Sequence, residues 1–186
     1  VDLSSFYFDI RKDVLYCDSL KSQKRNDCTI VLNIILECLL KWFAPILVFT
    51  TEEIFSLIDK SDNSIHEQNY ALVPKKWANS KLESKWKKLI EIKQKANIAI
   101  EEKRSNKEIG SSLEAQIQII VGKKSYDILD NLDLAEYFIT SKANRVKSQN
   151  EDEITIKVSK VSGKKCPRCW KILEKNCARC DEVLNQ

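Results

Sequence analysis

The apolar positions in the first sixty residues repeat with the period of an α-helix. Between residues 29 and 43 they include positions 30, 31, 34, 35, 38, 39, 42 and 43, which predicts a helix over Thr29–Phe43. An apolar cluster within Leu3–Tyr16 fits one face of an earlier helix. Pro45 interrupts the backbone hydrogen-bond ladder of the helix. A Thr-Thr-Glu-Glu capping box with Thr50 as N-cap then predicts a short helix to about Ile58.

The pattern changes twice more along the chain. From residue 77 to about 104, a mostly apolar stripe on a lysine-rich background predicts a long amphipathic helix. Strict alternation then predicts strands over 115–119 and 154–158, and Tyr137–Ile139 is expected to form a third, with a helix over Ser125–Leu132 between them. The expected fold is mainly α: a helical domain (1–104), a small α/β domain (105–160) and a four-cysteine zinc finger (161–186).

The composition narrows the class of protein. Three Gly and three Pro in 186 residues favour long helices and exclude collagen-like and linker-rich chains. No uncharged apolar run reaches the roughly 18 residues that a membrane span requires, and a start containing Asp2 and Asp9 is unlike a signal peptide. The absence of Met, with Val1 first, indicates a processed product or a piece of a longer chain. We expect a cytoplasmic, monomeric protein without membrane contact.

Basic residues are concentrated in two blocks. Residues 75–107 carry 11 basic and 4 acidic side chains, and residues 164–186 carry 6 and 3. Such blocks suit a polyanion such as nucleic acid, because phosphate contacts release counterions. A solvated helix face explains the first block equally well, and both interpretations stay open.

Four of the seven cysteines form two CxxC units. We interpret Cys17, Cys28 and Cys38, which are spread through an apolar region, as small buried hydrophobes. Two CxxC turns place four thiolates around one tetrahedral ion, and all four positions are filled by protein, which predicts a structural Zn²⁺ site. An iron–sulfur centre and a redox dithiol are the alternatives. The expected ligands are Cys166, Cys169, Cys177 and Cys180.

Arg168 lies within the first CxxC unit, and Trp170 directly follows it. A guanidinium and an indole held by a rigid metal loop can stack on an unpaired base and read its edge. Alternatively, Trp170 packs over the loop and Arg168 is solvated. The basic side chains around the cysteines first offset the formal charge of −2 that a zinc ion with four thiolate ligands carries.

Several segments resemble bacterial-type isoleucyl-tRNA synthetase, a class I enzyme. The resemblance implies an anticodon-binding domain, a small α/β domain and a zinc finger that together bind the isoleucine tRNA. The matching segments run from end to end of the chain: Asp2–Cys17, Trp42–Glu53, Glu101–Arg104, Lys107–Ala115, Tyr137–Ser141 and Cys166–Trp170.

The resemblance also assigns roles to residues. Arg168 and Trp170 would contact the anticodon, with Lys171 and Arg179 as weaker candidates. The seven residues between the two CxxC units are fewer than the family usually has, which puts contacts from residues 171–176 in question. The basic helix would contact phosphates.

The catalytic motifs of class I synthetases are missing. The chain has one His, His66, and no Met, so it lacks both ATP-binding signatures and is expected to carry no catalytic residue. ATP would bind only in a catalytic domain outside these residues, and editing would also take place there. Two rival functions are a zinc-finger module of a DNA glycosylase and a non-enzymatic zinc-ribbon adaptor.

Overall fold

The computed structural model describes residues 2–185 and divides the chain into two compact units. One unit combines the residues up to Ser19 with those from Asn79 onward, and the other is Leu20–Ala78. This grouping separates the start of the chain from the helices that follow it. The sequence-based division into 1–104, 105–160 and 161–186 is drawn on other grounds and stays a prediction.

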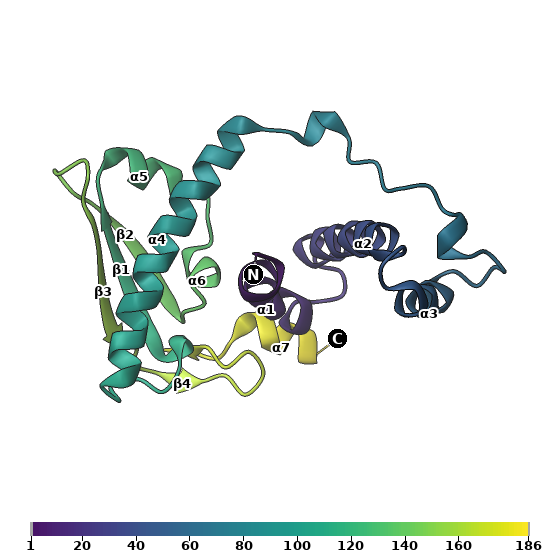
Figure 1. The fold of residues 1–186 in the computed structure, drawn as a ribbon. Helices are drawn as coiled ribbons and strands as arrows, with labels where there is room; N and C mark the ends of the chain where they lie inside the picture. The colour runs from purple at the N-terminus through teal and green to yellow at the C-terminus, as the bar shows by residue number, and fades with distance from the viewer. Residues whose placement is uncertain (1, 186) are drawn as a thin grey trace. The chain divides into compact units, whose positions relative to one another are not determined.

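The first unit contains a three-stranded sheet. Its strands are ordered β2 (Lys142–Lys147), β1 (Ala115–Val121), β3 (Ile154–Lys160), with β1 parallel to β2 and antiparallel to β3. The long helix α4 (Ser80–Ser105) runs along one face of this sheet (Figure 1). Asn79 begins α4 by accepting a hydrogen bond from the Leu82 N–H at 3.0 Å.

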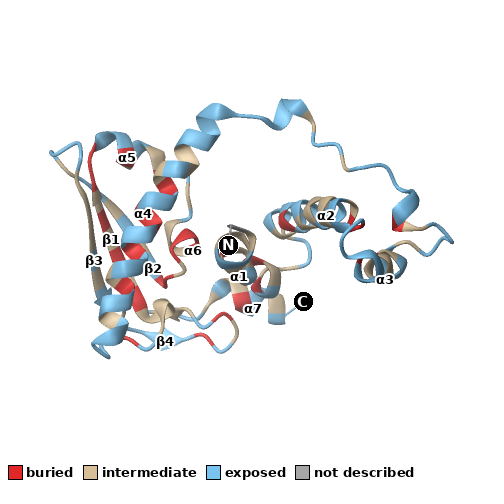
Figure 2. Ribbon diagram, in the orientation of Figure 1, coloured by how far each residue is buried: buried red, intermediate tan, exposed pale blue. Residues whose placement is uncertain are grey.

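Alternation along β1 builds the core of this unit. Every second residue, from Ala115 to Val121, has no exposed surface, and these side chains join the buried positions of α4 (Figure 2). Burying each of the isoleucine and valine side chains among them stabilises the fold by about 1.5–3 kcal/mol. The buried α4 residues of this cluster are Leu89, Ile92, Ala96 and Ile100.

The segment between β1 and β2 differs from the expectation in one element. It contains α5 (Lys123–Ile128) and α6 (Leu134–Tyr137), and the expected strand over Tyr137–Ile139 is wrong. Asp133 caps α6 by accepting from the Glu136 N–H at 3.0 Å, and Ile139 has a left-handed φ of 56°. The apolar run is buried in a helical turn, an arrangement that a three-residue pattern does not distinguish from a strand.

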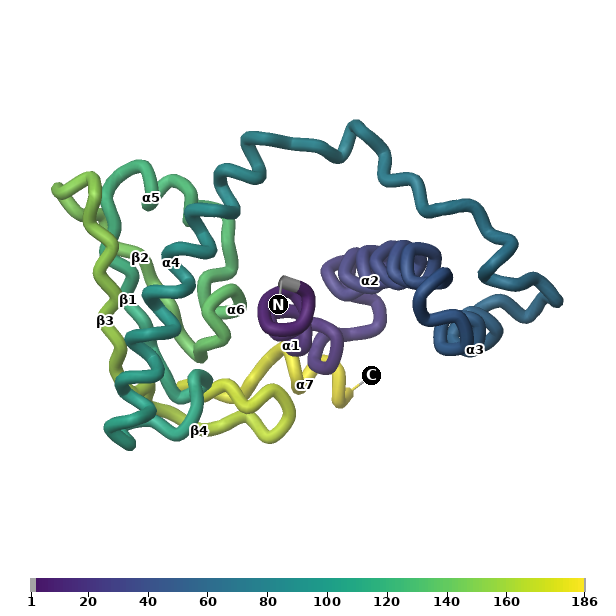
Figure 3. The backbone as a smooth tube through the Cα atoms, viewed as in Figure 1, coloured from purple at the N-terminus to yellow at the C-terminus, as the bar shows by residue number. Residues whose placement is uncertain are grey.

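The N-terminal and C-terminal segments both belong to the first unit. The chain starts in a π-helix, η1 (Asp2–Phe8), and continues in α1 (Asp9–Cys17). The last segment forms a two-stranded sheet and a helix that contacts α1 (Figure 3): β4 (Lys164–Lys165), β5 (Ile172–Leu173) and α7 (Ala178–Leu184).

Glycine is required where the chain enters this C-terminal segment. Gly163 has a φ of 145°, and a Cβ atom there would lie 2.4 Å from the carbonyl oxygen of Leu173. A side chain at this position would therefore push apart β4 and β5, the strands on either side of the first cysteine pair.

The second unit contains two helices and two short 3-10 turns. Its small core is formed by Leu40, Ala44 and Ile65, with Ile54 and Phe55 packed against them. The elements are α2 (Gln23–Phe43), α3 (Val48–Ile58), η2 (Ile65–Glu67) and η3 (Lys75–Trp77). Within residues 2–185, no helix combines the length and apolar character needed to cross a bilayer.

Both helices of this unit begin earlier than their sequence patterns indicate. Ser22 caps α2, so the polar residues before Thr29 are helical. The capping box at Thr50 is wrong, because α3 starts at Val48 and Thr50 therefore lies inside the helix. The neighbouring Thr51 is buried, and its hydroxyl donates to the Leu47 carbonyl at 2.9 Å. A threonine hydroxyl inside a helix bonds its own preceding turn and no longer acts as a cap.

Lys93 is buried in the core of the first unit. Only 7% of it is exposed, and its Nζ donates to the Tyr137 carbonyl at 2.6 Å and lies 5.2 Å from the Tyr137 ring centroid. Burial lowers the pKa of Lys93 to about 8, although the charge of Asp9 opposes this effect. Burial also raises the pKa of Tyr137.

These two groups predict how the stability of the metal-loaded chain depends on pH. Between the folded pKa of Lys93, about 8, and its ordinary 10.5, the unfolded state binds more protons, so stability rises with pH. We expect a gain of about 1.5 kcal/mol from pH 8 to 9.5, and a decline above pH 10 as Tyr137 ionises first in the unfolded state. Urea unfolding of the wild type and of Lys93→Met measures this rise, and an equal rise in Lys93→Met would contradict the assignment.

Candidate functional site

The four cysteines of the two CxxC units lie together. We call Cys166–Cys169 the first knuckle and Cys177–Cys180 the second knuckle. All four sulfur atoms lie within 4.8 Å of one another, and the sulfurs of Cys169 and Cys177 are 3.8 Å apart. Sulfurs about 2.3 Å from a tetrahedral ion are about 3.8 Å from each other. The cluster therefore fits a single Zn²⁺-sized ion.

Local backbone hydrogen bonds shape the first knuckle. The Cys166 N–H donates to the Lys171 carbonyl at 2.9 Å, and the Trp170 N–H donates back to the Cys166 carbonyl at 3.0 Å. This tight turn holds Trp170 in the left-handed region, with a φ of 63°. Such a backbone is unusual for a bulky residue and persists only where its surroundings fix it.

The thiols of the cluster differ in their tendency to ionise. Burial raises the pKa of Cys166, but hydrogen bonds from the backbone N–H groups of Cys169 and Arg168 outweigh this and lower it to about 7. Burial raises the pKa of Cys180 to about 12. A bound divalent cation would stabilise all four thiolates and offset the cost of their burial.

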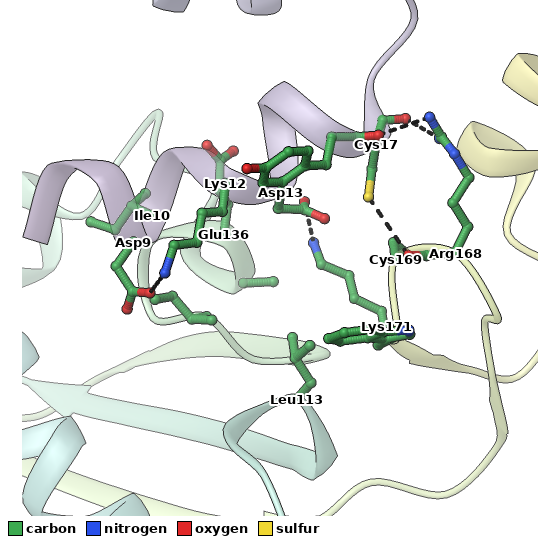
Figure 4. Close-up of a pocket in the computed structure, with 14 residues that line it drawn as sticks. Asp9, Ile10, Lys12, Asp13, Cys17, Leu113, Glu136, Arg168, Cys169 and Lys171 are labelled. Atoms are coloured by element: carbon green, nitrogen blue, oxygen red, sulfur yellow. Dashed lines mark hydrogen bonds and ion pairs between the residues drawn. The ribbon is translucent and has the colours of Figure 1, made fainter. Parts of the chain in front are cut away.

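Arg168, in the first knuckle, contacts the end of α1. Its guanidinium donates to the carbonyl of Tyr16 at 2.9 Å and to that of Cys17 (Figure 4). The last carbonyls of a helix have no partner within the helix and carry partial negative charge. The same guanidinium lies 3.9 Å from the Cys180 sulfur, so Arg168 joins the cysteine cluster to α1.

Arg179, in the second knuckle, contacts the same helix. Its two terminal nitrogens donate to the two carboxylate oxygens of Asp13 at 2.7 and 2.8 Å, and one of them reaches Asp18 at 3.2 Å. The Lys171 ammonium lies 3.6 Å from Asp13. Burial raises the pKa of Asp13, but the Arg179 hydrogen bonds and the charges of Lys171 and Arg179 outweigh it, so the pKa lies below its ordinary value.

Among the contact residues predicted from the sequence, Trp170 has a solvent-exposed side chain. It is 61% exposed, and the Lys165 ammonium lies 5.8 Å from its ring centroid. Trp170 also lines a cavity of about 500 Å³ between α1, α6 and the first knuckle. The structure thus brings the four candidates together, with Arg168, Lys171 and Arg179 bonded to α1 and Trp170 presented to solvent.

The sequence analysis did not identify Asp13 as part of this site. Its carboxylate is 166 positions away from Arg179 in the sequence. The available signal was an acidic pair, Asp13 on α1 and Asp18 directly after it, in a chain whose knuckles are basic. That signal alone does not select a partner.

The basic block of α4 is partly neutralised by neighbouring carboxylates. Four of its cations lie in ion pairs of 2.7–2.9 Å, and Lys93 is buried. Lys81 and Lys95 are exposed. The paired cations are Lys87, Lys88, Lys103 and Arg104.

Comparison with known proteins places the chain in a family. A family model described as the anticodon-binding domain of tRNA ligase matches residues 1–119. The isoleucine–tRNA ligase of Pelagibacter ubique is 54% identical over 179 residues, which cover 96% of this chain and 20% of that protein. Those of Agrobacterium fabrum and Zymomonas mobilis are each 37% identical, over 92% and 100% of this chain and over 19% and 20% of their own lengths.

The chain thus spans about a fifth of the length of these relatives. The match agrees with the resemblance seen in the sequence, and it favours neither a DNA glycosylase nor a zinc-ribbon adaptor. The chain belongs to the family of tRNA ligase anticodon-binding domains, and it corresponds to the anticodon-binding region of isoleucine–tRNA ligases.

Proposed function

We propose that this chain binds the anticodon stem-loop of the isoleucine tRNA within a ligase that attaches isoleucine to that tRNA using ATP. The observation that carries the proposal is the exposed Trp170, held in a left-handed turn by a four-cysteine cluster. The chemistry of activation and editing takes place elsewhere in the ligase. The contribution of this region is to position and select the tRNA. We assign the protein to the cytoplasm and to a monomeric state.

We propose that Cys166, Cys169, Cys177 and Cys180 hold one structural Zn²⁺. The spacing of their sulfur atoms supports this assignment, as does the completeness of the ligand set, which leaves no position for a reacting water. The zinc would hold the two knuckles in one rigid body.

Within this interface we assign direct base contact to Trp170. An exposed indole offers a flat face on which an unpaired base can stack. Arg168, Lys171 and Arg179 add positive charge near the RNA, but their hydrogen bonds and ion pairs to α1 also hold the knuckles. Exposed lysines of α4 such as Lys81 and Lys95 would contact phosphates and add affinity without sequence information.

Replacing Trp170 tests the base contact. Trp170→Ala should weaken binding of an isoleucine tRNA transcript by about 1–3 kcal/mol, because it removes one stacking platform. Trp170→Gly should lose the same affinity, although glycine adopts the left-handed backbone at this position without strain. If the two variants bind equally weakly, the loss comes from removal of the ring and not from a change in the backbone. Fluorescence anisotropy with labelled tRNA measures both.

The matched control is a second exposed tryptophan. Trp42 on α2 is 46% exposed, and Trp42→Ala should bind tRNA within a factor of about two of the wild type. If Trp170→Ala retains the metal and binds tRNA as tightly as the wild type does, the indole is a packing residue and the assigned contact is wrong.

A further inference from the structure

We propose that Asp13 is a positioning residue for tRNA recognition: it holds both knuckles against α1 and thereby sets the direction in which Trp170 points. The proposal rests on the function proposed above. It assigns a role in RNA recognition to a carboxylate on a different segment of the chain, one that would itself repel RNA.

Contacts from both sides of the cysteine cluster converge on Asp13. Arg179 approaches from the second knuckle with two hydrogen bonds of 2.7 and 2.8 Å. Lys171, which follows Trp170 two residues after the first knuckle, approaches Asp13 to 3.6 Å (Figure 4). One side chain of α1 therefore connects to the residue next to Trp170 and to the opposite end of the cluster.

The positions of these groups make the contacts directional. The side chains of Asp13 and Lys171 are 24% and 17% exposed, so water screens their charges less than at an open surface. The fork of Arg179 engages both carboxylate oxygens, an arrangement that fixes orientation as well as distance. Arg168 adds two hydrogen bonds to the carbonyl end of the same helix.

The metal site alone does not supply this orientation. A tetrahedral ion fixes the four sulfurs relative to one another, but it does not fix the knuckles relative to the rest of the unit. The regular structure around them is small: β4 and β5 have two residues each, and the Ile172 N–H donates to the Ser141 hydroxyl at 2.7 Å. The α1 contacts therefore add a direct restraint on rotation of the cysteine cluster.

Charge and position predict opposite results for Asp13→Asn. Removing a negative charge near the RNA should strengthen binding of a polyanion if charge alone matters. Loss of the paired hydrogen bonds between Arg179 and Asp13 should weaken binding if Asp13 positions Trp170. We expect about a tenfold weaker affinity for an isoleucine anticodon stem-loop RNA, measured on the zinc-loaded chain by fluorescence anisotropy.

A double-mutant cycle tests whether the effect passes through Trp170. Asp13→Asn should weaken binding about tenfold in the wild-type chain. In a Trp170→Ala chain it should weaken binding less than twofold, because the indole that Asp13 positions is absent. Asp181, exposed on α7, provides the charge-matched control, and Asp181→Asn should bind the RNA as tightly as the wild type or slightly more tightly. Metal content is measured for every variant.

Each outcome decides the proposal. Equal loss in both backgrounds, or tighter binding by Asp13→Asn, overturns the positioning role and leaves the proposed function standing. If Trp170→Ala itself has no effect, the proposed base contact fails and the positioning role fails with it. If Asp13→Asn loses the metal, Asp13→Glu replaces it in the cycle, because it keeps the charge and displaces Arg179. An unchanged affinity in Asp13→Glu would then overturn the proposal.

Discussion

Cys180→Ser should release the metal and abolish the tRNA contact of the cysteine cluster. Cys180 is 1% exposed, and the buried residues around it are themselves cysteines, so the knuckles have almost no apolar core. Structural zinc supplies on the order of 10 kcal/mol to folding in such sites. Without it, the turn that holds Trp170 is lost. We expect tRNA affinity to fall at least fivefold, the lower end of the loss of about 1–3 kcal/mol predicted for the ring alone.

The same substitution should leave the sheet intact. The core between β1 and α4 is a separate cluster that contains none of the four cysteines. Hydrogen exchange should therefore become fast at the Cys166 and Trp170 amides and stay slow along β1. Cys38→Ser, at a half-buried cysteine of α2, should retain metal and affinity. Slow exchange at Trp170 in metal-free Cys180→Ser would show that the metal does not hold the turn.

The elements that sequence analysis located correctly are those with a local signal. β1 was predicted because apolar and polar residues alternate over Ala115–Ile119, and α4 because its stripe extends from Leu82 to Ile100. The cysteine cluster was predicted because the spacing within each CxxC unit by itself brings two sulfurs together. In each case the relevant residues are close in sequence.

The features that the sequence did not locate depend on distant partners. Tyr137–Ile139 resembles a strand by composition, but Tyr137 packs against Phe6 and Trp86, which come from other parts of the chain. In the sequence, nothing distinguishes Asp13 from an exposed acidic residue on a helix, because its ion pair with Arg179 forms only in the folded chain. Such pairings depend on the tertiary fold and leave no spacing pattern in the sequence.

Replacing the anticodon of the tRNA should weaken binding by roughly 100-fold. Contacts to phosphates bind any RNA of similar shape, whereas contacts to bases distinguish sequences. A single mismatched base typically costs about 1–3 kcal/mol in nucleic-acid recognition, and an anticodon exchange changes up to three bases. Duplex DNA would be bound only through charge, by exposed lysines such as Lys95, and this binding should fall steeply as salt increases.

The most direct test compares three nucleic acids on one metal-loaded chain at physiological salt. They are the isoleucine tRNA, the same tRNA with an exchanged anticodon, and a DNA duplex of similar length. We predict tight binding of the first, about 100-fold weaker binding of the second, and weak, salt-sensitive binding of the third. Equal affinity for all three would contradict anticodon recognition by this chain.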